Sequence, residues 1–295
     1  MYATPETLRI DVGDGDELGV VRWHGRPGAS VAFAIHGITA NAWSWAAVAR
    51  HLDGEVGLVA IDLRGRGLSH RTGGPHGMRR HGDDVAAIVD RLSAAPAVVA
   101  GHSMGSSVAL ACAERHPASV SELVLVDGGI PLPVPEGMAP QEALDALIGP
   151  AIERLRHVWA DRVSYEAMWA QHPSFAEIGL TPEIERYVLS DLIEVDGGFR
   201  SCVDEAAIRF DGGELLIDDE MRSLLERRQR PATIIRAETG IMATPPPLIP
   251  VEWIERLPQH DWHTVEGANH YSVLIGEAGA AAVAQSLRDA VARTA

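Results

Sequence analysis

The feature that most constrains the fold of this chain is the pentapeptide Gly101-His102-Ser103-Met104-Gly105. It follows an apolar run at 97–100 and opens a stretch of helical spacing at 104–115. A buried strand, a sharp turn with serine at its apex and a helix together form a nucleophile elbow. Glycine is needed on both sides of the serine because a side chain there would collide with the neighbouring backbone. The sequence therefore predicts a strained serine at the N-terminus of a helix, where developing negative charge is favoured.

Short apolar runs alternate with helical patterns through the first half of the chain. Two runs, at 8–12 and 18–23, flank Gly13-Asp14-Gly15-Asp16 and predict a hairpin. Buried strands are expected at 30–35, 57–61, 97–100 and 122–126, and helices at 43–52, 81–92 and 104–115. This order predicts an α/β fold with a mostly parallel central sheet and helices on both faces.

The alternation ends at Gly128, and Pro131, Pro133 and Pro135 mark an exit from the core. Apolar residues then recur at helical spacing over 144–159, with polar partners that include Glu153 and Arg154. Strand character returns at 231–236 and 262–265, and a last helix is expected over 278–292. We therefore expect one core, formed by 1–131 and 231–295, with a helical cap inserted at 132–230.

Composition and charge exclude several classes of protein. The chain of 295 residues is 46% hydrophobic, which is enough for a large buried core. Its net charge of −16 argues against a nucleic-acid partner, which would need a basic patch. The same charge disfavours anionic lipid surfaces and highly anionic substrates, unless a local basic pocket overrides it.

The cellular context is predicted from what the sequence lacks. The N-terminal residues carry neither a basic region nor an apolar run, so we expect no signal peptide. No apolar stretch approaches the roughly 20 residues that a membrane-spanning helix needs, so no membrane insertion is expected. Cys112 and Cys202 leave one disulfide open but form no disulfide framework. A cytoplasmic protein is expected, with its oligomeric state left open.

Four motifs, in this order along the chain, resemble the α/β-hydrolase superfamily. His36-Gly37 follows the third expected strand, and the stretch at 62–69 (Asp-Leu-Arg-Gly-Arg-Gly-Leu-Ser) follows the fourth. The elbow follows the fifth, and Asn269-His270-Tyr271 follows the last. The resemblance implies an esterase- or lipase-like serine hydrolase with a helical cap. These motifs are specific for a fold and not for a substrate.

The resemblance implies that Ser103 is the nucleophile and His270 its base. A serine hydroxyl needs an adjacent base, and His270 lies in a loop just after an expected strand. His102 flanks the nucleophile and is expected to pack or bond beside it. Solvated or structural roles are expected for four other histidines: His70, His76, His81 and His157.

The resemblance also implies an oxyanion hole made of backbone N–H groups. One donor is expected from Met104, the residue after the nucleophile, and the other from Ile38, in the loop after His36-Gly37. Neither a metal nor an organic cofactor is expected, because no ligand cluster or nucleotide-binding loop is present.

Two residues compete for the acid that orients the base. Superfamily members usually place it in the loop after the strand at 231–236, but there the common position is occupied by Gly240. Glu238 lies nearby. A minority of members use an acid at the end of the preceding core strand, which is Asp127 here. The hypothesis that we favour is Asp127, with Glu238 as the alternative.

The expected reaction is cleavage of a carboxylic ester or lactone through an acyl-enzyme on Ser103. Thioesters and amides remain open, and Trp159, Met168 and Trp169 of the cap are candidates either for an acyl pocket or for cap packing. The alternative is a binding protein on a hydrolase scaffold, with slow turnover or none.

Overall fold

The structure is a computed structural model that describes residues 4–92, 94–132 and 137–294, so Pro133 and Pro135 lie outside the described residues. Within these ranges an eight-stranded sheet runs in the order β1-β2-β4-β3-β5-β6-β9-β10. Its strands are β1 (Glu6–Gly13), β2 (Asp16–Trp23), β3 (Val31–Ile35), β4 (Gly57–Ile61), β5 (Ala97–His102), β6 (Val120–Val126), β9 (Thr233–Ala237) and β10 (Asp261–Val265).

The sheet is mostly parallel, as predicted. β1 and β2 form the expected antiparallel hairpin, and β2 also pairs with β4 in antiparallel fashion. The pairs from β4 through β3, β5, β6 and β9 to β10 are all parallel. The carboxyl ends of these parallel strands therefore meet at one edge of the sheet, which is where such folds place their sites.

Helices cover both faces of the sheet because the side chains of each central strand alternate between two buried clusters. On β3, Ala32 and Ala34 face one cluster, whereas Phe33 and Ile35 face the other. The first face is covered by α1 (Ala46–Leu52), α12 (Ser272–Ile275) and α13 (Glu277–Thr294). The second is covered by α2 (Met78–Arg91) and α3 (Met104–Arg115), with α11 (Glu252–Arg256) packed beside them.

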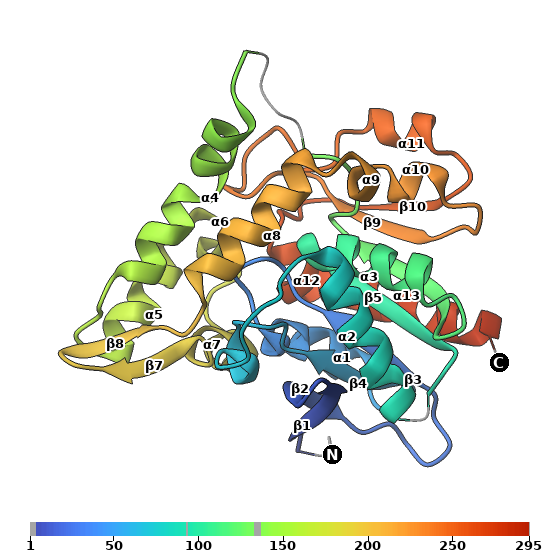
Figure 1. Cartoon of the computed structure of the whole chain (residues 1–295), viewed down its shortest axis with the longest axis horizontal. Helices are drawn as coiled ribbons and strands as arrows, with labels where there is room; N and C mark the ends of the chain where they lie inside the picture. The colour runs from blue at the N-terminus through green and yellow to red at the C-terminus, as the bar shows by residue number, and fades with distance from the viewer. Residues whose placement is uncertain (1–3, 93, 133–136, 295) are drawn as a thin grey trace.

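A cap is inserted between β6 and β9, and Figure 1 shows it projecting to one side of the sheet. It comprises a hairpin and seven helices within the described ranges. They are α4 (Pro140–Arg156), α5 (Arg162–Gln171), α6 (Pro173–Ala176), α7 (Pro182–Leu189), β7 (Leu192–Val195), β8 (Gly198–Ser201), α8 (Glu205–Ile217), α9 (Asp219–Arg222) and α10 (Leu224–Arg227). The boundaries of core and cap as separate domains stay a prediction.

Two local predictions need correction, and one hairpin was not predicted. The helix predicted over 43–52 is divided into a 3-10 turn, η1 (Ala42–Trp45), and α1, because the Asn41 side chain caps the turn. The helix predicted over 144–159 ends at Arg156, and Trp159 instead pairs with Phe199 in an isolated β-bridge. The β7–β8 hairpin was not predicted, although Asp196-Gly197 between its strands is a hairpin signal.

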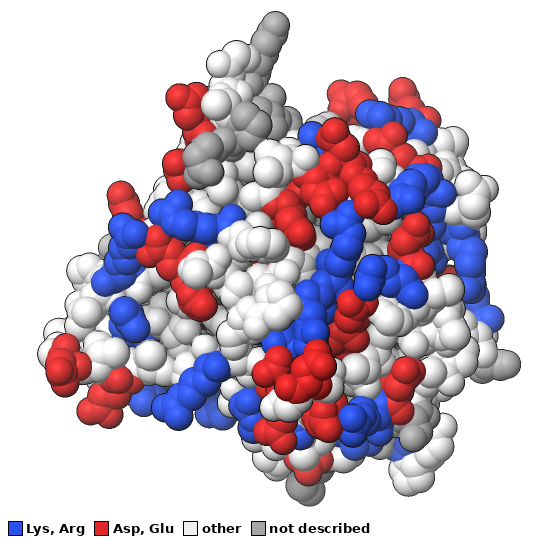
Figure 2. Space-filling model, viewed as in Figure 1, with Lys and Arg blue, Asp and Glu red and all other residues white. Residues whose placement is uncertain are grey.

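Charged side chains of both signs are interspersed on the face shown in Figure 2, where basic groups lie among acidic ones. No helix within the described ranges combines the length and apolarity that crossing a membrane would require. Cys112 and Cys202 are both buried and free, which closes the disulfide alternative.

Candidate active site

The turn between β5 and α3 has the geometry of a nucleophile elbow. Ser103 has φ 55° and ψ −123°, a strained conformation for a residue with a side chain. A Cβ added at Gly101 would collide with the carbonyl oxygen of Gly105, and one at Gly105 would collide with that of Ile35. The flanking glycines therefore let the turn pack against its own helix and against β3.

His270 joins Ser103 to Asp127. Its Nε2 lies 3.1 Å from Ser103 Oγ, and its Nδ1 lies 2.7 Å from Asp127 Oδ2. The loop that carries it is fixed by Asn269, whose side-chain oxygen accepts hydrogen bonds from the backbone N–H groups of Tyr271 and Ser272. The three residues come from the ends of three different parallel strands and form one continuous hydrogen-bonded chain.

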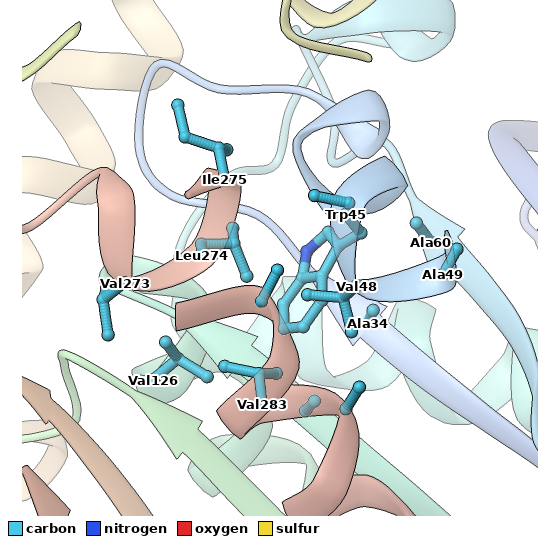
Figure 3. Close-up of a cluster of buried hydrophobic side chains, with 14 of the residues drawn as sticks. Ala34, Trp45, Val48, Ala49, Ala60, Val126, Val273, Leu274, Ile275 and Val283 are labelled. Carbon is cyan, nitrogen blue, oxygen red and sulfur yellow. The ribbon is translucent and has the colours of Figure 1, made fainter. Parts of the chain in front are cut away.

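Asp127 is fully buried at the end of β6. Its Oδ1 accepts a hydrogen bond from the Ala237 N–H at 3.0 Å, which leaves Oδ2 for His270. Its φ of 45° turns the chain sharply after the strand. The preceding residue, Val126, packs with Val273 and Val283 in one buried cluster (Figure 3), so the strand that ends in Asp127 is held against the helices that follow His270.

The loop after β9 does not supply this contact. The carboxylate of Glu238 instead accepts a hydrogen bond from the Gly267 N–H at 2.7 Å, on the exposed side of the loop. A Cβ at Gly240 would lie 2.5 Å from the Pro246 carbonyl oxygen, so the backbone leaves no room for a side chain there. Between the two candidate acids, the structure brings Asp127 to His270.

The loop after β3 is held in place by buried polar contacts. Burial lowers the pKa of His36 to about 3, so its ring is neutral. Its Nε2 accepts a hydrogen bond from the Leu63 N–H, which leaves Nδ1 to donate to the Gly37 carbonyl at 2.7 Å. Arg66 Nε donates to the Ile38 carbonyl at 3.1 Å. The bond to the Gly37 carbonyl orients the peptide group that contains the Ile38 N–H, and the bond from Arg66 orients the peptide group that follows it.

The two expected oxyanion donors lie beside the serine. Ile38 and Met104 line the same cavity as Ser103, and a Cβ at Gly37 would lie 3.3 Å from Ser103 Cβ. Met104 is the first residue of α3, where a backbone N–H has no acceptor within its own helix. Such an N–H group is available to an oxygen bound above Ser103.

His102 contacts His270, the expected base, through its ring and through the backbone. Burial, together with the nearby His270, lowers the pKa of His102 to about 3, so this ring is also neutral. Its Nε2 donates to the His270 carbonyl at 2.9 Å, and the two rings stack with centroids 4.8 Å apart. His102 was expected to pack or bond beside the nucleophile, and in the structure its ring contacts are with His270.

A cavity of about 500 Å³ lies above Ser103, between the strand ends and the cap. Met168 and Trp169 line it, whereas Trp159 packs against His157 and Tyr165. Apolar side chains from core and cap make up most of the remaining wall: Leu132, Ile148, Leu215, Ile241, Leu248, Leu274 and Ile275. A cavity of this size and character suits a small, largely apolar ligand.

Two arginines of this region were not predicted to belong to the site. Arg66 is fully buried beneath the loop that carries Ile38, and Arg154 lines the cavity rather than the outer face of α4. In sequence, Arg66 is part of an Arg-Gly-Arg-Gly stretch between apolar residues, and that setting is the signal that could have revealed its burial. Arg154 offers no comparable signal, because it alternates with other charged residues on a helix.

No group of His, Cys, Asp or Glu side chains within the described ranges is arranged to hold a metal ion. The chemistry that this arrangement can perform is nucleophilic attack by a serine activated by a histidine, since the histidine is oriented by a buried carboxylate.

Comparison with known proteins agrees with this fold. The family model described as "alpha/beta hydrolase fold" matches residues 33–155. The chain is 33% identical over 150 residues to lipase LipV of Mycobacterium tuberculosis, an alignment that covers 48% of this chain and 56% of LipV. It therefore spans just over half of that relative's length.

Two further likenesses extend over most of the chain. The chain is 26% identical over 238 residues to 2-(acetamidomethylene)succinate hydrolase of Mesorhizobium japonicum, covering 80% of each protein. The crystal structure of an E-2-(acetamidomethylene)succinate hydrolase superposes with a TM-score of 0.80 at 22% identity, covering 98% of this chain and 100% of the other. The chain has the α/β-hydrolase fold, and the proteins that it is similar to include a lipase, an esterase/perhydrolase and another hydrolase.

Proposed function

We propose that this protein is a serine hydrolase that cleaves a carboxylic ester or lactone through an acyl-enzyme on Ser103. The observation that carries the proposal is the unbroken hydrogen-bonded chain from Ser103 through His270 to Asp127 beside an apolar cavity. The match of residues 33–155 to the α/β-hydrolase family model supports hydrolysis, and the cavity supports a small substrate.

The residues have distinct roles in the proposed mechanism. Ser103 Oγ attacks the carbonyl carbon of the substrate while its proton passes to His270 Nε2. Asp127 holds Nδ1 and stabilises the positive charge that forms on the ring. The backbone N–H groups of Ile38 and Met104 bind the oxyanion of the tetrahedral intermediate.

His270 accepts and returns a proton in both halves of the reaction. When the intermediate collapses, the bond to the leaving oxygen breaks, and Nε2 returns its proton to release the alcohol. Water then attacks the acyl-enzyme and gives its proton to the same nitrogen. The released acid and the restored Ser103 hydroxyl complete the cycle, so no cofactor is consumed.

The first test is Ser103→Ala, with Ser107→Ala, one turn further along α3, as a matched control. We expect the Ser103 variant to lose at least about 10³-fold in kcat on p-nitrophenyl esters and to keep the wild-type circular dichroism spectrum, because nucleophile and base act as a unit. The Ser107 variant should retain activity. Near-wild-type activity in purified Ser103→Ala protein would contradict the proposal.

A fluorophosphonate probe separates an enzyme from a binding protein on the same scaffold. Covalent labelling requires an activated serine, so we expect labelling of the wild-type protein and none of Ser103→Ala. Absence of labelling in the folded wild-type protein would favour the binding protein. Rates on matched ester, lactone, thioester and amide substrates would then rank the bond types for an active enzyme.

A further inference from the structure

The wall of the cavity has an unusual charge for this protein. The chain carries 41 acidic residues, yet no Asp or Glu is found among the described residues that line the cavity. Among those lining residues, Arg154 is the one whose side chain is permanently charged. The protein is strongly acidic, but the described lining of this cavity has no acidic side chain and one permanently charged cation.

Arg154 is held in a fixed position by the cap. Its Nη1 donates to the Tyr165 hydroxyl at 2.8 Å and to Asp191 Oδ2 at 2.9 Å. The Tyr165 hydroxyl also donates to Asp191, and Ser201 Oγ donates to the other carboxylate oxygen at 2.7 Å. The guanidinium lies over the ring of Trp169, with its central carbon 5.0 Å from the centroid. These contacts fix both the position and the plane of the guanidinium.

The opposite edge of the guanidinium remains available. A guanidinium has five N–H donors, of which the two on Nη1 are used by Tyr165 and Asp191. No acceptor among the described residues bonds to Nε or Nη2 of Arg154, which lines the cavity. Neither atom is among the fully buried atoms that lack a hydrogen-bond partner. The Nε–Nη2 edge is the one that binds a carboxylate with two parallel hydrogen bonds.

Arg154 lines the same cavity as the proposed nucleophile. Trp169, beneath Arg154, contacts Tyr271 with ring centroids 6.2 Å apart, and Tyr271 contacts His270 with centroids 5.7 Å apart. A ligand in the cavity can therefore reach Ser103 at one end and Arg154 at the other. Apolar side chains make up much of the rest of the wall, so an apolar connection between the two ends of the ligand suits this cavity.

The geometry points to a substrate that carries a carboxylate, bound by Arg154, at the end remote from its scissile carbonyl. This inference deepens the proposed function and rests on it, because it assigns the substrate class to the same site. The substrate would be an ester with a free acid group in either its acyl or its alcohol part. Burial lowers and the neighbouring Tyr165 and Asp191 raise the pKa of Arg154, with a net rise that keeps the cation charged.

The first experiment uses the wild-type enzyme and two pairs of nearly isosteric esters. Monoethyl adipate is compared with ethyl 6-methylheptanoate, and 5-acetoxypentanoate with 5-methylhexyl acetate, by titrating the acid released. In at least one pair we expect kcat/KM to be about 10- to 100-fold higher for the anionic ester, since a charge-assisted bond has a strength of that order. Equal rates or faster neutral esters in both pairs would overturn the inference.

The second experiment replaces the cation. Arg154→Met should lose the preference for the anionic ester, and Arg154→Lys should keep part of it as a point charge. Arg156→Met is the matched control, because Arg156 lies on the same helix but pairs with Glu205 at the surface. Hydrolysis of p-nitrophenyl acetate, which carries no carboxylate, should remain in Arg156→Met, and each Arg154 variant is judged by the ratio of its kcat/KM values on the anionic and the neutral ester of a pair.

A binding measurement keeps the inference testable without catalysis or an unstable variant. Adipate should bind Ser103→Ala protein more tightly than 1,6-hexanediol does, by about 10-fold or more in calorimetry. Equal binding of the two would count against the role of Arg154. Adipate binding without fluorophosphonate labelling of the wild-type protein would instead contradict the serine mechanism, so the two failures are distinguishable.

Discussion

Two histidine–aspartate pairs are fully or almost fully buried within the described part of the chain, one in the core and one between core and cap. His270 Nδ1 lies 2.7 Å from Asp127, and His81 Nε2 lies 3.0 Å from Asp211. The partners are 143 residues apart in the first pair and 130 in the second. The two pairs consist of the same residue types, and by residue type alone each could belong to a catalytic site.

The difference lies in what surrounds each pair. The second nitrogen of His270 lies 3.1 Å from Ser103 at the cavity, whereas Nδ1 of His81 is buried without a partner among the described residues. Asp211 also lies 2.6 Å from Arg66 Nη2, in an ion-pair contact rather than an aligned hydrogen bond. A histidine–carboxylate pair is therefore not an indication of catalysis until a nucleophile and an open cavity adjoin it.

The second pair links α8 of the cap to α2 of the core. Asp211 and Glu214 of α8 accept hydrogen bonds from the N–H groups of Gly77 and Met78, at the start of α2. Burial alone would raise the pKa of Asp211, but Arg66 and His81 more than offset this and hold it well below its usual range. Because Arg66 also holds the Ile38 carbonyl, the cap helix α8 and the proposed oxyanion loop share one ionic anchor.

The largest expected effect is on the core pair. Asp127→Asn should lower kcat by about 10²- to 10⁴-fold without unfolding the protein, because the imidazole loses its orienting charge and can take the wrong tautomer. Steady-state kinetics and circular dichroism measure this. Glu238→Gln is the control and should have little effect on kcat. If Glu238→Gln were the damaging change, the acid would be misassigned.

The cap pair should respond in stability rather than in chemistry. Asp211→Asn leaves Arg66 buried without its ion partner, so we expect the free energy of unfolding to fall by about 3 kcal/mol. Chemical denaturation measures this, with Asp218→Asn, whose partner Arg79 is partly exposed, as a milder control. A loss of kcat as large as that of Asp127→Asn, with normal stability, would break the distinction between the pairs.

The contrast also explains what the sequence could predict. The elbow depends on residues within one short segment, and Asp127 follows an apolar strand, so local patterns pointed to both. His270 follows a largely exposed strand and was placed by the resemblance to the superfamily. The pairing of Asp211 with Arg66 and His81 was not predicted, because nothing local tells a buried aspartate on α8 from a solvated one. His81 was expected to be solvated or structural, and it is fully buried.

The fold shows the same division between local and long-range information. The parallel strands β3, β4 and β5 were predicted because each contains a continuous apolar run, and the Gly13–Asp16 turn identified the first hairpin. The cap was predicted to be helical from its period alone, so the β7–β8 hairpin and the bridge from Trp159 to Phe199 were missed. Their side chains are only partly buried, and they do not form apolar runs.

A smaller effect is expected from an acid placed at the usual superfamily position. Gly240→Asp should lower the free energy of unfolding by about 1–3 kcal/mol, because its Cβ would crowd the Pro246 carbonyl oxygen. Gly73→Asp, at a glycine with open space around it, is the matched control for thermal denaturation. Combined with Asp127→Asn, Gly240→Asp should restore no activity, and restored activity would show that this loop can serve His270.

The smallest expected effect is on the pH dependence of the unfolding free energy. It concerns His102, whose ring packs against that of His270 in the core pair. Its pKa is about 3 in the folded protein against 6.5 for a free histidine, so between these values the unfolded chain binds more protons. Stability attributable to His102 is therefore present above about pH 6.5 and is lost as the pH falls toward 3.

Burial raises the pKa of Asp62 to about 7, which opposes this trend in the wild-type protein and in a variant alike. Comparison with His102→Gln cancels that contribution: from pH 6 to pH 4 the wild-type unfolding free energy should fall by roughly 1 kcal/mol per pH unit more than that of the variant. Parallel pH profiles from denaturant titrations would show that His102 is not held neutral by its burial beside His270.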